Sequence, residues 1–398
     1  DEVFDVTPYA AAFARFFLGH ELSGGMPRKI KTAFSGCSDD CAVTPIHDIG
    51  YIARIRDGVK GFEIVMGGGL SILPKAAVSL YDFVPLDDEK WIRIAEAALR
   101  IFDRSTEERK NRMKARIKFM IDRIGVDELR KQVEEELKGD WAKPELDYAA
   151  LLDIENEEKE VVPADAPAYG VPLDEIDGPA DFQEWKRTNV EAQRQPGYNL
   201  VYVSLVRGDI RADQFPALTE LMRNYSSGRA RVDIQQNLVL RWIRTEDVLT
   251  VYNLLKAVGL NGAGQHTITD MVTCPGTDSC KLGITSSMGL NQALRQALAD
   301  YDTSDPLVNA LHIKASGCPN SCGQHHIANI GFHGAVMRGQ GGQVPAYEIF
   351  LGGAYQDGTR MGTRVKARVP ARKAPEALIK MLDFYQATRR DNERFNAF

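Results

Sequence analysis

The sequence contains little cysteine and no long apolar segment. Six cysteines among 398 residues are too few for a secreted disulfide scaffold. No apolar run approaches the roughly 18–20 residues that span a bilayer, so we expect no membrane partner. The net charge of −6 lacks the basic excess typical of nucleic-acid binders. The first residues, DEVFDVTPYA, are acidic, so we do not expect them to act as a signal peptide. Together these absences favour a cytoplasmic globular enzyme.

The six cysteines form three close pairs in loops rich in Gly, Pro, Asp and Ser. The pairs are Cys37 and Cys41 in SGCSDDC, Cys274 and Cys280 in CPGTDSC, and Cys318 and Cys322 in SGCPNSCGQ. Reduced, partly buried thiols are one interpretation of any single pair. Structural zinc is another, although the five residues between Cys274 and Cys280 fit its usual ligand spacing poorly. Four thiolates on two loops suit a [4Fe–4S] cluster.

Two stretches of the chain repeat one another. Residues 35–51, SGCSDDCAVTPIHDIGY, align without a gap with residues 316–332, SGCPNSCGQHHIANIGF. Each copy then runs into a Gly-rich strand end, at 65–70 and 350–355. This self-similarity predicts two copies of one α/β unit. Only the second copy has a further cysteine pair upstream. We therefore expect one cluster, in the C-terminal copy, and interpret Cys37 and Cys41 as leftover thiols.

The order of patterns predicts an α+β protein of several domains, because 398 residues exceed the size of one core. A pseudo-twofold repeat of α/β units flanks a ferredoxin-like α+β sandwich. The expected limits are 1–139 for the first unit with a helical extension, 140–188 for an acidic, Pro-rich linker, 189–262 for the ferredoxin-like half-domain and 263–398 for the second unit. Within the extension, residues 106–124 predict one basic helix. Its charges either face solvent or dock an acidic partner.

Three motifs then resemble one known family. CPGTDSC, SGCPNSCGQ and the upstream PRKIKTAFSG are similar to the sirohaem-containing nitrite and sulfite reductases, and QNLVLRWI supports the resemblance, which covers essentially the whole chain. It implies that Cys274, Cys280, Cys318 and Cys322 bind a [4Fe–4S] cluster. It also implies that Cys322 bridges to the iron of sirohaem. We expect Asn320 to contribute backbone close to these cofactors.

The resemblance also implies substrate-binding cations in Pro27-Arg28-Lys29-Ile30-Lys31. Alternate residues of a strand point the same way, so Lys29 and Lys31 are predicted to face the haem together, while Arg28 points away or reaches a haem carboxylate. The alternative is an exposed edge strand, where lysine is common. Lysine at both positions favours six-electron reduction of sulfite to sulfide. Nitrite reduction to ammonia is the alternative, because the C-terminal half resembles nitrite-type members.

The chain departs from the family in its module count. The family has two ferredoxin-like halves, whereas this sequence shows one, and the chain begins where the first should have ended. An N-terminal ferredoxin-like module is therefore expected to be missing. A truncated inactive fragment, or an iron–sulfur electron carrier, remains an alternative. We find no NADPH or flavin motif, so electrons are expected from ferredoxin or a flavoprotein subunit.

Overall fold

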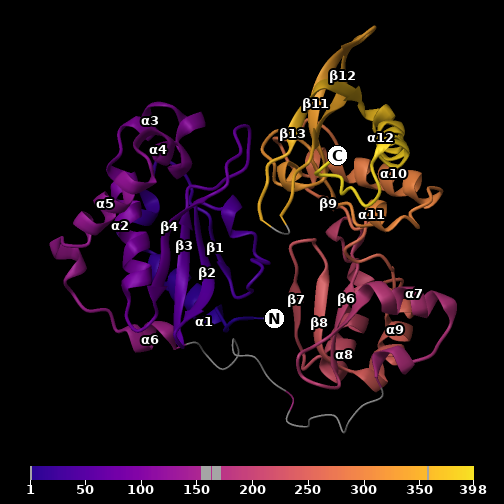
Figure 1. Cartoon of the computed structure of the whole chain (residues 1–398), viewed down its shortest axis with the longest axis horizontal. Coiled ribbons are helices and arrows are strands. Elements are labelled where there is room, and N and C mark those ends of the chain that lie inside the picture. Colours follow the sequence, from indigo (N-terminus) through magenta and orange to yellow (C-terminus); the bar gives the residue numbers. More distant parts are fainter. Residues whose placement is uncertain (1, 154–162, 164–171, 356–357) are drawn as a thin grey trace. The chain divides into compact units, whose positions relative to one another are not determined.

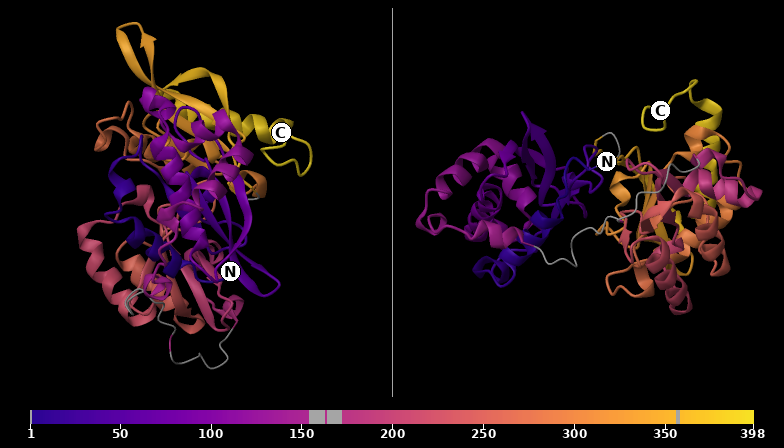
Figure 2. Two further views of the ribbon diagram at one scale, coloured as in Figure 1. Left: turned by 90° about the vertical axis from the view of Figure 1, so that its left-hand side faces the viewer. Right: turned by 90° about the horizontal axis from the view of Figure 1, so that it is seen from below.

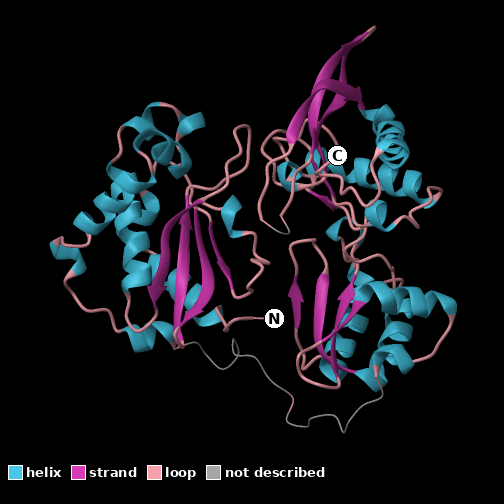
Figure 3. Cartoon of the chain, in the orientation of Figure 1, coloured by secondary structure: helices cyan, strands magenta, loops and turns pink. Residues whose placement is uncertain are grey.

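The computed structural model describes residues 2–153, 163, 172–355 and 358–398. The chain divides into two compact units. Unit 1 comprises Asp1–Glu160 with Tyr355–Met361, and unit 2 comprises Val161–Ala354 with Gly362–Phe398. Both contain sheets and helices, which confirms the predicted α+β class (Figure 3). In the described part of the chain, no helix has the length and apolar character needed to cross a membrane.

Unit 1 is built on a four-stranded sheet in the order β1-β2-β3-β4, with only β1 and β2 parallel. Its strands are β1 (Thr32–Ser35), β2 (Ile49–Arg56), β3 (Val59–Met66) and β4 (Val78–Pro85). Its helices are α1 (Thr7–Phe17), α2 (Lys90–Arg104), α3 (Glu107–Lys110), α4 (Ile117–Ile124), α5 (Val126–Glu136) and α6 (Tyr148–Leu152) (Figure 1). Aromatic side chains join β1, β2, β3 and α2, because Phe34, Tyr51, Phe62 and Trp91 lie in one core.

The prediction of one basic helix over residues 106–124 is wrong. The segment forms two short helices, α3 and α4, with a 3₁₀ turn at Arg112–Lys114 between them. Arg116 is extended, with φ −108° and ψ 151°, and only 9% of it is exposed. Lys118 is also buried. The predicted solvent-facing charge is therefore wrong for these two residues. Arg116 donates to the buried Asp48, and Lys118 donates to backbone carbonyls of residues 69–73.

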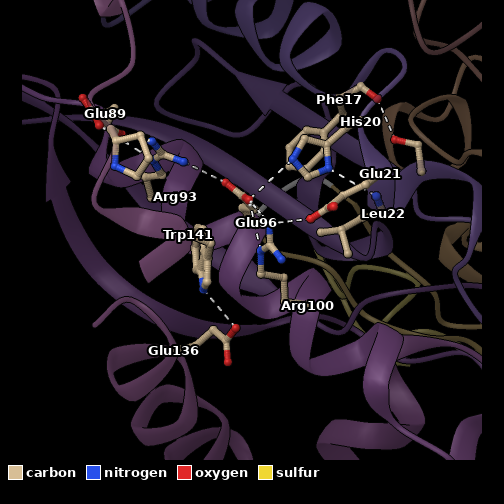
Figure 4. Close-up of polar contacts among 12 residues, drawn as sticks. Phe17, His20, Glu21, Leu22, Glu89, Arg93, Glu96, Arg100, Glu136 and Trp141 are labelled. Carbon is tan, nitrogen blue, oxygen red and sulfur yellow. Dashed lines mark hydrogen bonds and ion pairs between the residues drawn. The ribbon is translucent and has the colours of Figure 1, made fainter. Parts of the chain in front are cut away.

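A buried ion cluster fixes α2 within unit 1. Glu96 is 2% exposed and accepts hydrogen bonds from Arg93 at 3.1 Å and Arg100 at 2.9 Å, with His20 Nε2 at 3.4 Å (Figure 4). The guanidinium of Arg100 also lies 4.5 Å from the Trp141 ring centroid. Residues 93, 96 and 100 share one helical face because of their three- and four-residue spacing. The cluster therefore ties α2 to the segments that carry His20 and Trp141.

Unit 2 contains an antiparallel sheet in the order β5-β6-β8-β7. Its strands are β5 (Val190–Ala192), β6 (Tyr198–Val203), β7 (Ala230–Val232) and β8 (Leu238–Arg244), and its helices are α7 (Ala180–Asn189), α8 (Phe215–Tyr225) and α9 (Val248–Ala257). Helix α7 falls within the predicted linker, yet its Phe182 and Trp185 are fully buried in the core of this sheet. Residues 154–162 and 164–171 of the linker lie outside the described residues.

The other sheet of unit 2 has the order β13-β12-β11-β10-β9. Its strands are β9 (Val272–Thr273), β10 (Ile313–Ser316), β11 (Ile330–Gly339), β12 (Gly342–Leu351) and β13 (Thr363–Pro370), with helices α10 (Ser287–Ala299), α11 (Pro306–Asn309) and α12 (Ala374–Thr388). The tip of the β11–β12 hairpin projects beyond the rest of the unit (Figures 1 and 2). Strands β9, β10 and β11 are parallel to one another, and this arrangement positions the cysteine loops.

The structure confirms the predicted repeat in detail. Strands β1 and β2 pair in parallel from Thr32 with Ile49 onward, and β10 and β11 pair in parallel from Ile313 with Ile330 onward, which is the register of the sequence alignment. The loops between the paired strands also share their left-handed positions. In the first copy these are Asp40 and Val43, and in the second Ser321 and Gln324.

Candidate functional site

The four predicted cluster cysteines lie in two loops of unit 2 that begin at one edge of a sheet. Cys274 follows β9, and Cys318 follows Gly317 at the end of β10. Strands β9 and β10 are parallel neighbours, with Ala315 opposite Thr273. Parallel neighbours end at the same edge of a sheet, so the topology brings both loops together. The Cys274 N–H donates to the Ala315 carbonyl at 3.2 Å.

The two loops interlock through glycines. A Cβ on Gly317 would lie 2.5 Å from the Cα of Gly276, so no larger residue fits between the loops. Gly276 also has a φ of +56°, which side chains disfavour. The Gly317 carbonyl accepts the Ile284 and Thr285 N–H groups at 2.8 and 3.1 Å. The CPGTDSC and SGCPNSC segments therefore form one rigid cradle.

Backbone amides of this cradle point at sulfur. The Gly317 N–H donates to Cys274 Sγ at 3.1 Å, and the Asn320 N–H donates to the Cys318 thiol. Burial raises the pKa of Cys318, and the charges of Cys322, Cys274 and Cys280 raise it further. Cys318 therefore lies within electrostatic range of the other three thiols. Cys318 is 8% exposed, whereas Cys280 and Cys322 are exposed.

This arrangement fits a cluster better than a single ion. Among the described residues, no three His, Cys, Asp or Glu side chains are grouped to hold one metal ion. A zinc site would place four ligands about 2.0–2.3 Å from one ion. A [4Fe–4S] cluster instead takes four thiolates spread around a larger body and is tuned by N–H donors to sulfur. Four cysteines on two adjacent loops, with two N–H donors to sulfur, fit the second description.

The ferredoxin-like half anchors the first cysteine loop. The side chain of Gln236 donates to the Thr273 carbonyl at 2.9 Å and accepts the Thr273 N–H at 3.0 Å. On the opposite side, Ser287 Oγ donates to the Cys274 carbonyl at 2.5 Å. Gln236 opens the QNLVLRWI motif, but the sequence did not reveal its anchoring role. A glutamine turned toward a strand in another sheet has no local signature.

The predicted lysines of unit 1 lie immediately before β1, and both are exposed. The strand that was predicted to include Lys29 and Lys31 does not include them, since β1 begins at Thr32. Lys31 is nevertheless held at its backbone. Its N–H donates to Asp48 Oδ2 at 2.8 Å, and its carbonyl accepts the Asp48 and Ile49 N–H groups. The second copy repeats this clamp, because the His312 N–H donates to Asn329 Oδ1 at 2.8 Å.

Arg116 and Lys118 form a buried basic cluster that was not predicted from the sequence, and Asp48 connects Arg116 to the backbone of Lys31. Asp48 is fully buried and accepts hydrogen bonds from Arg116 at 2.7 and 2.5 Å. Burial, and then the charge of Arg116, lower the pKa of Lys118 to about 8. The Lys118 ammonium donates to three carbonyls of the Gly-rich loop, those of Gly69, Leu70 and Leu73. The sequence shows Arg116 and Lys118 only as two basic residues two positions apart, a pattern that predicts charge on the surface of a helix.

The remaining predicted cofactor residues are placed as follows. Arg28 is half-buried and donates to the Arg112 carbonyl at 2.8 Å. The Asn320 side chain is exposed, while its backbone faces Cys318. Arg28, Lys29 and Lys31 belong to unit 1, and Asn320 and the four cysteines belong to unit 2. Their roles as site residues stay predictions.

Comparison with known proteins decides the family. Residues 1–140 and 264–398 match the model of the nitrite and sulphite reductase 4Fe-4S domain, and residues 191–258 match that of the nitrite/sulfite reductase ferredoxin-like half domain. The chain belongs to the nitrite and sulphite reductase family. This confirms the resemblance expected from the cysteine motifs.

Individual members of the nitrite and sulphite reductase family show the same likeness. The chain is 27% identical to a ferredoxin–nitrite reductase of Synechococcus elongatus, over 90% of this chain and 63% of that protein. It is 28% identical to sulfite reductase [ferredoxin] 1 of Mycolicibacterium paratuberculosis, over 99% of this chain and 66% of that protein. The structure of the NirA protein of Mycobacterium tuberculosis matches with a TM-score of 0.76 and 27% identity, over 100% of this chain and 67% of that one. The chain thus spans just under two thirds of these curated relatives.

Proposed function

We propose that the cradle in unit 2 binds a [4Fe–4S] cluster through Cys274, Cys280, Cys318 and Cys322. The observation that carries the proposal is the delivery of four thiols by two interlocked loops at one sheet edge. The two N–H donors to sulfur support it. Family membership adds independent support, because the matched domain is described by its 4Fe-4S cluster.

We further propose that sirohaem binds beside the cluster, with Cys322 as the shared thiolate and Arg28 and Asn320 as further contacts. Cys322 and Cys280 are both exposed, whereas Cys318 is buried, so exposure is compatible with this role for Cys322. The resemblance of SGCPNSCGQ to the family motif is what favours Cys322 over Cys280. When bound, the two cofactors would supply single electrons and an open iron position, which no side chain can provide. Lys29 and Lys31 would supply positive charge to a small anion. Their exposed side chains and the backbone clamp on Lys31 support that assignment.

The proposed reaction is the six-electron reduction of a small oxyanion. Sulfite is favoured over nitrite because lysine occupies both positions 29 and 31, and nitrite is the alternative. The relatives include proteins named as ferredoxin–nitrite reductases and as sulfite reductases [ferredoxin]. We therefore propose ferredoxin as the electron donor, with a flavoprotein subunit as the other candidate.

Cofactor binding is tested by anaerobic reconstitution of the full chain with iron and sulfide, then with sirohaem. We expect iron and inorganic sulfide to be incorporated, followed by intense visible absorption on addition of sirohaem. A cluster without sirohaem uptake would reduce the proposal to an electron carrier. Stoichiometric zinc binding without iron uptake would contradict it altogether.

Substrate choice is tested by viologen-driven reduction of sulfite and of nitrite by the loaded chain. A higher kcat/KM for sulfite is expected, and a preference for nitrite would overturn the choice. Lys31→Asn is expected to lower kcat/KM by about tenfold or more, because a cation that touches the developing charge is lost. Lys131, exposed on α5, provides the matched control. Equal effects of Lys31→Asn and Lys131→Asn would remove Lys31 from the site.

A further inference from the structure

Unit 1 contains a second cysteine pair that the proposed function does not use. Cys37 and Cys41 occupy the positions that Cys318 and Cys322 occupy in the other copy of the repeat. The two loops share their strand register and their left-handed residues, so the first loop keeps the shape of a cluster-binding loop. In the described part of unit 1, no other cysteine accompanies the pair. Two thiols are thus held in a ligand-like arrangement in this loop.

The two thiols contact one another. Cys37 and Cys41 form a side-chain hydrogen bond, and the Cys41 N–H also donates to Cys37 sulfur. The hydrogen bond from the Cys41 thiol lowers the pKa of Cys37 to about 7, against an opposing effect of burial. The same bond raises the pKa of Cys41. Cys37 is half-buried and Cys41 is exposed, so a small reagent can reach the pair.

The loop around the pair is held at both ends. Before it, the Val3 N–H donates to the Gly36 carbonyl at 2.6 Å. After it, the Asp40 carboxylate accepts the Thr44 N–H and the Thr44 hydroxyl, each at 2.9 Å. Between these ends, the Asp40 N–H donates to the Cys37 carbonyl at 3.3 Å, so a turn brings the two cysteines close to one another. A disulfide between them would have an S–S distance of about 2.05 Å.

We propose that Cys37 and Cys41 form a reversible dithiol–disulfide site that exchanges with the disulfide of a small thiol such as glutathione. The Cys37 thiolate attacks one sulfur of the glutathione disulfide, forms a mixed disulfide and releases one glutathione thiolate. Cys41 then attacks the Cys37 sulfur, loses its proton and releases the second glutathione. The protein loses two hydrogen atoms, and the glutathione disulfide is reduced to two thiols.

Peptide mapping of the full chain tests the site without any cofactor. Trypsin cuts after Lys31 and Arg54 and releases residues 32–54, which contain Cys37 and Cys41 and no other cysteine. The chain is equilibrated with reduced and oxidised glutathione, alkylated and digested. We expect this peptide to become lighter by two hydrogen atoms and to resist alkylation, and excess dithiothreitol to reverse both changes. Two alkylated thiols under all glutathione ratios would overturn the proposal.

Single variants test the order of the steps. Cys41→Ser is expected to trap a glutathione adduct on Cys37, because the resolving thiol is gone. Cys37→Ser is expected to form its adduct at least tenfold more slowly near pH 7, because burial and the charge of Asp39 still raise the pKa of the Cys41 thiol when Cys37 is absent. In Cys41→Ser, by contrast, the serine hydroxyl can still donate a hydrogen bond to the Cys37 sulfur. Equal adduct rates in the two variants would refute the assigned order. Protection of the pair that a chelator abolishes would instead show a bound metal ion and overturn the disulfide proposal.

Discussion

Asp48 is the residue whose removal should most disturb unit 1 around the proposed substrate lysine. Its fully buried carboxylate accepts three hydrogen bonds, two from Arg116 and one from the Lys31 N–H. The Arg116 side chain is itself only 11% exposed. Asp48→Ala would leave a buried guanidinium without its partner. Breaking one side of a buried pair in this way costs about 3–5 kcal/mol of unfolding free energy.

A double-mutant cycle isolates the interaction from the loss of packing. Arg116→Ala alone should also be costly, since it leaves the Asp48 carboxylate buried with only the Lys31 N–H. The double variant removes both charges, so its cost should fall below the sum of the single variants by about 2–3 kcal/mol. The control is Glu135→Ala, a change on α5 that removes an exposed ion pair with Lys138. It should leave the free energy of unfolding unchanged.

The assay is native hydrogen exchange of peptides from β1 and β2, because it reports the opening of unit 1 separately from unit 2. Faster exchange in Asp48→Ala, partly restored in the double variant, is the expected result. Additive single effects, or a cost below about 1 kcal/mol for Asp48→Ala, would refute the reasoning. In that case Arg116 would already be hydrated, and Asp48 would serve the backbone of Lys31 alone.

Three further changes test other parts of the structure. Gly317→Ala should reduce iron incorporation at least tenfold, because its Cβ would lie 2.5 Å from the Gly276 Cα. Gly36→Ala is the control at the matching position of the first copy, where the nearest atom lies 3.1 Å away, and it should not reduce iron incorporation. Equal iron contents in the two variants would contradict the proposed interlocking of the loops. Lys118 has a pKa lowered to about 8 against about 10.4 when unfolded. The folded state thus holds fewer protons between these values, so stability should rise with pH across that window, and Lys118→Met should lack the rise in urea titrations. Glu96→Ala should destabilise the chain by about 3–5 kcal/mol in thermal unfolding. Glu21→Ala, which removes the exposed partner of Arg100, should have little effect, and similar melting of the two variants would exclude a special role for Glu96.

The fold was largely predictable because its signals are local or repeated. The Ser-Gly-Cys and Ile-Gly-aromatic matches identified two copies whose strand registers agree residue by residue. The failures arose where a distant partner decides the conformation. Residues 106–124 have a helical pattern, but the buried carboxylate of Asp48 draws Arg116 out of that pattern. A sequence pattern cannot show a partner that lies 68 positions away.

The candidate site divides in the same way. Cysteine spacing pointed to the four thiols that the structure brings together in unit 2. The cysteine spacing did not identify Gln236, which hydrogen-bonds to the backbone of Thr273 from a different sheet. It also did not identify Lys118, whose ammonium donates hydrogen bonds to carbonyls of a Gly-rich loop. The lysine pair was predicted from its charge and from an expected strand. That strand, β1, begins only at Thr32, and the Lys31 N–H donates to the Asp48 side chain.

The two copies of the repeat also show what the loop shape alone contributes. In the second copy, β9 lies parallel to β10 and brings Cys274 and Cys280 to the same edge as Cys318. In the first copy, β1 and β2 pair in the matching parallel register, and the loop that holds Cys37 and Cys41 has the same left-handed positions. The loop shape therefore brings one pair of cysteines together in each copy, and the four-thiol site that we propose also requires the parallel strand β9.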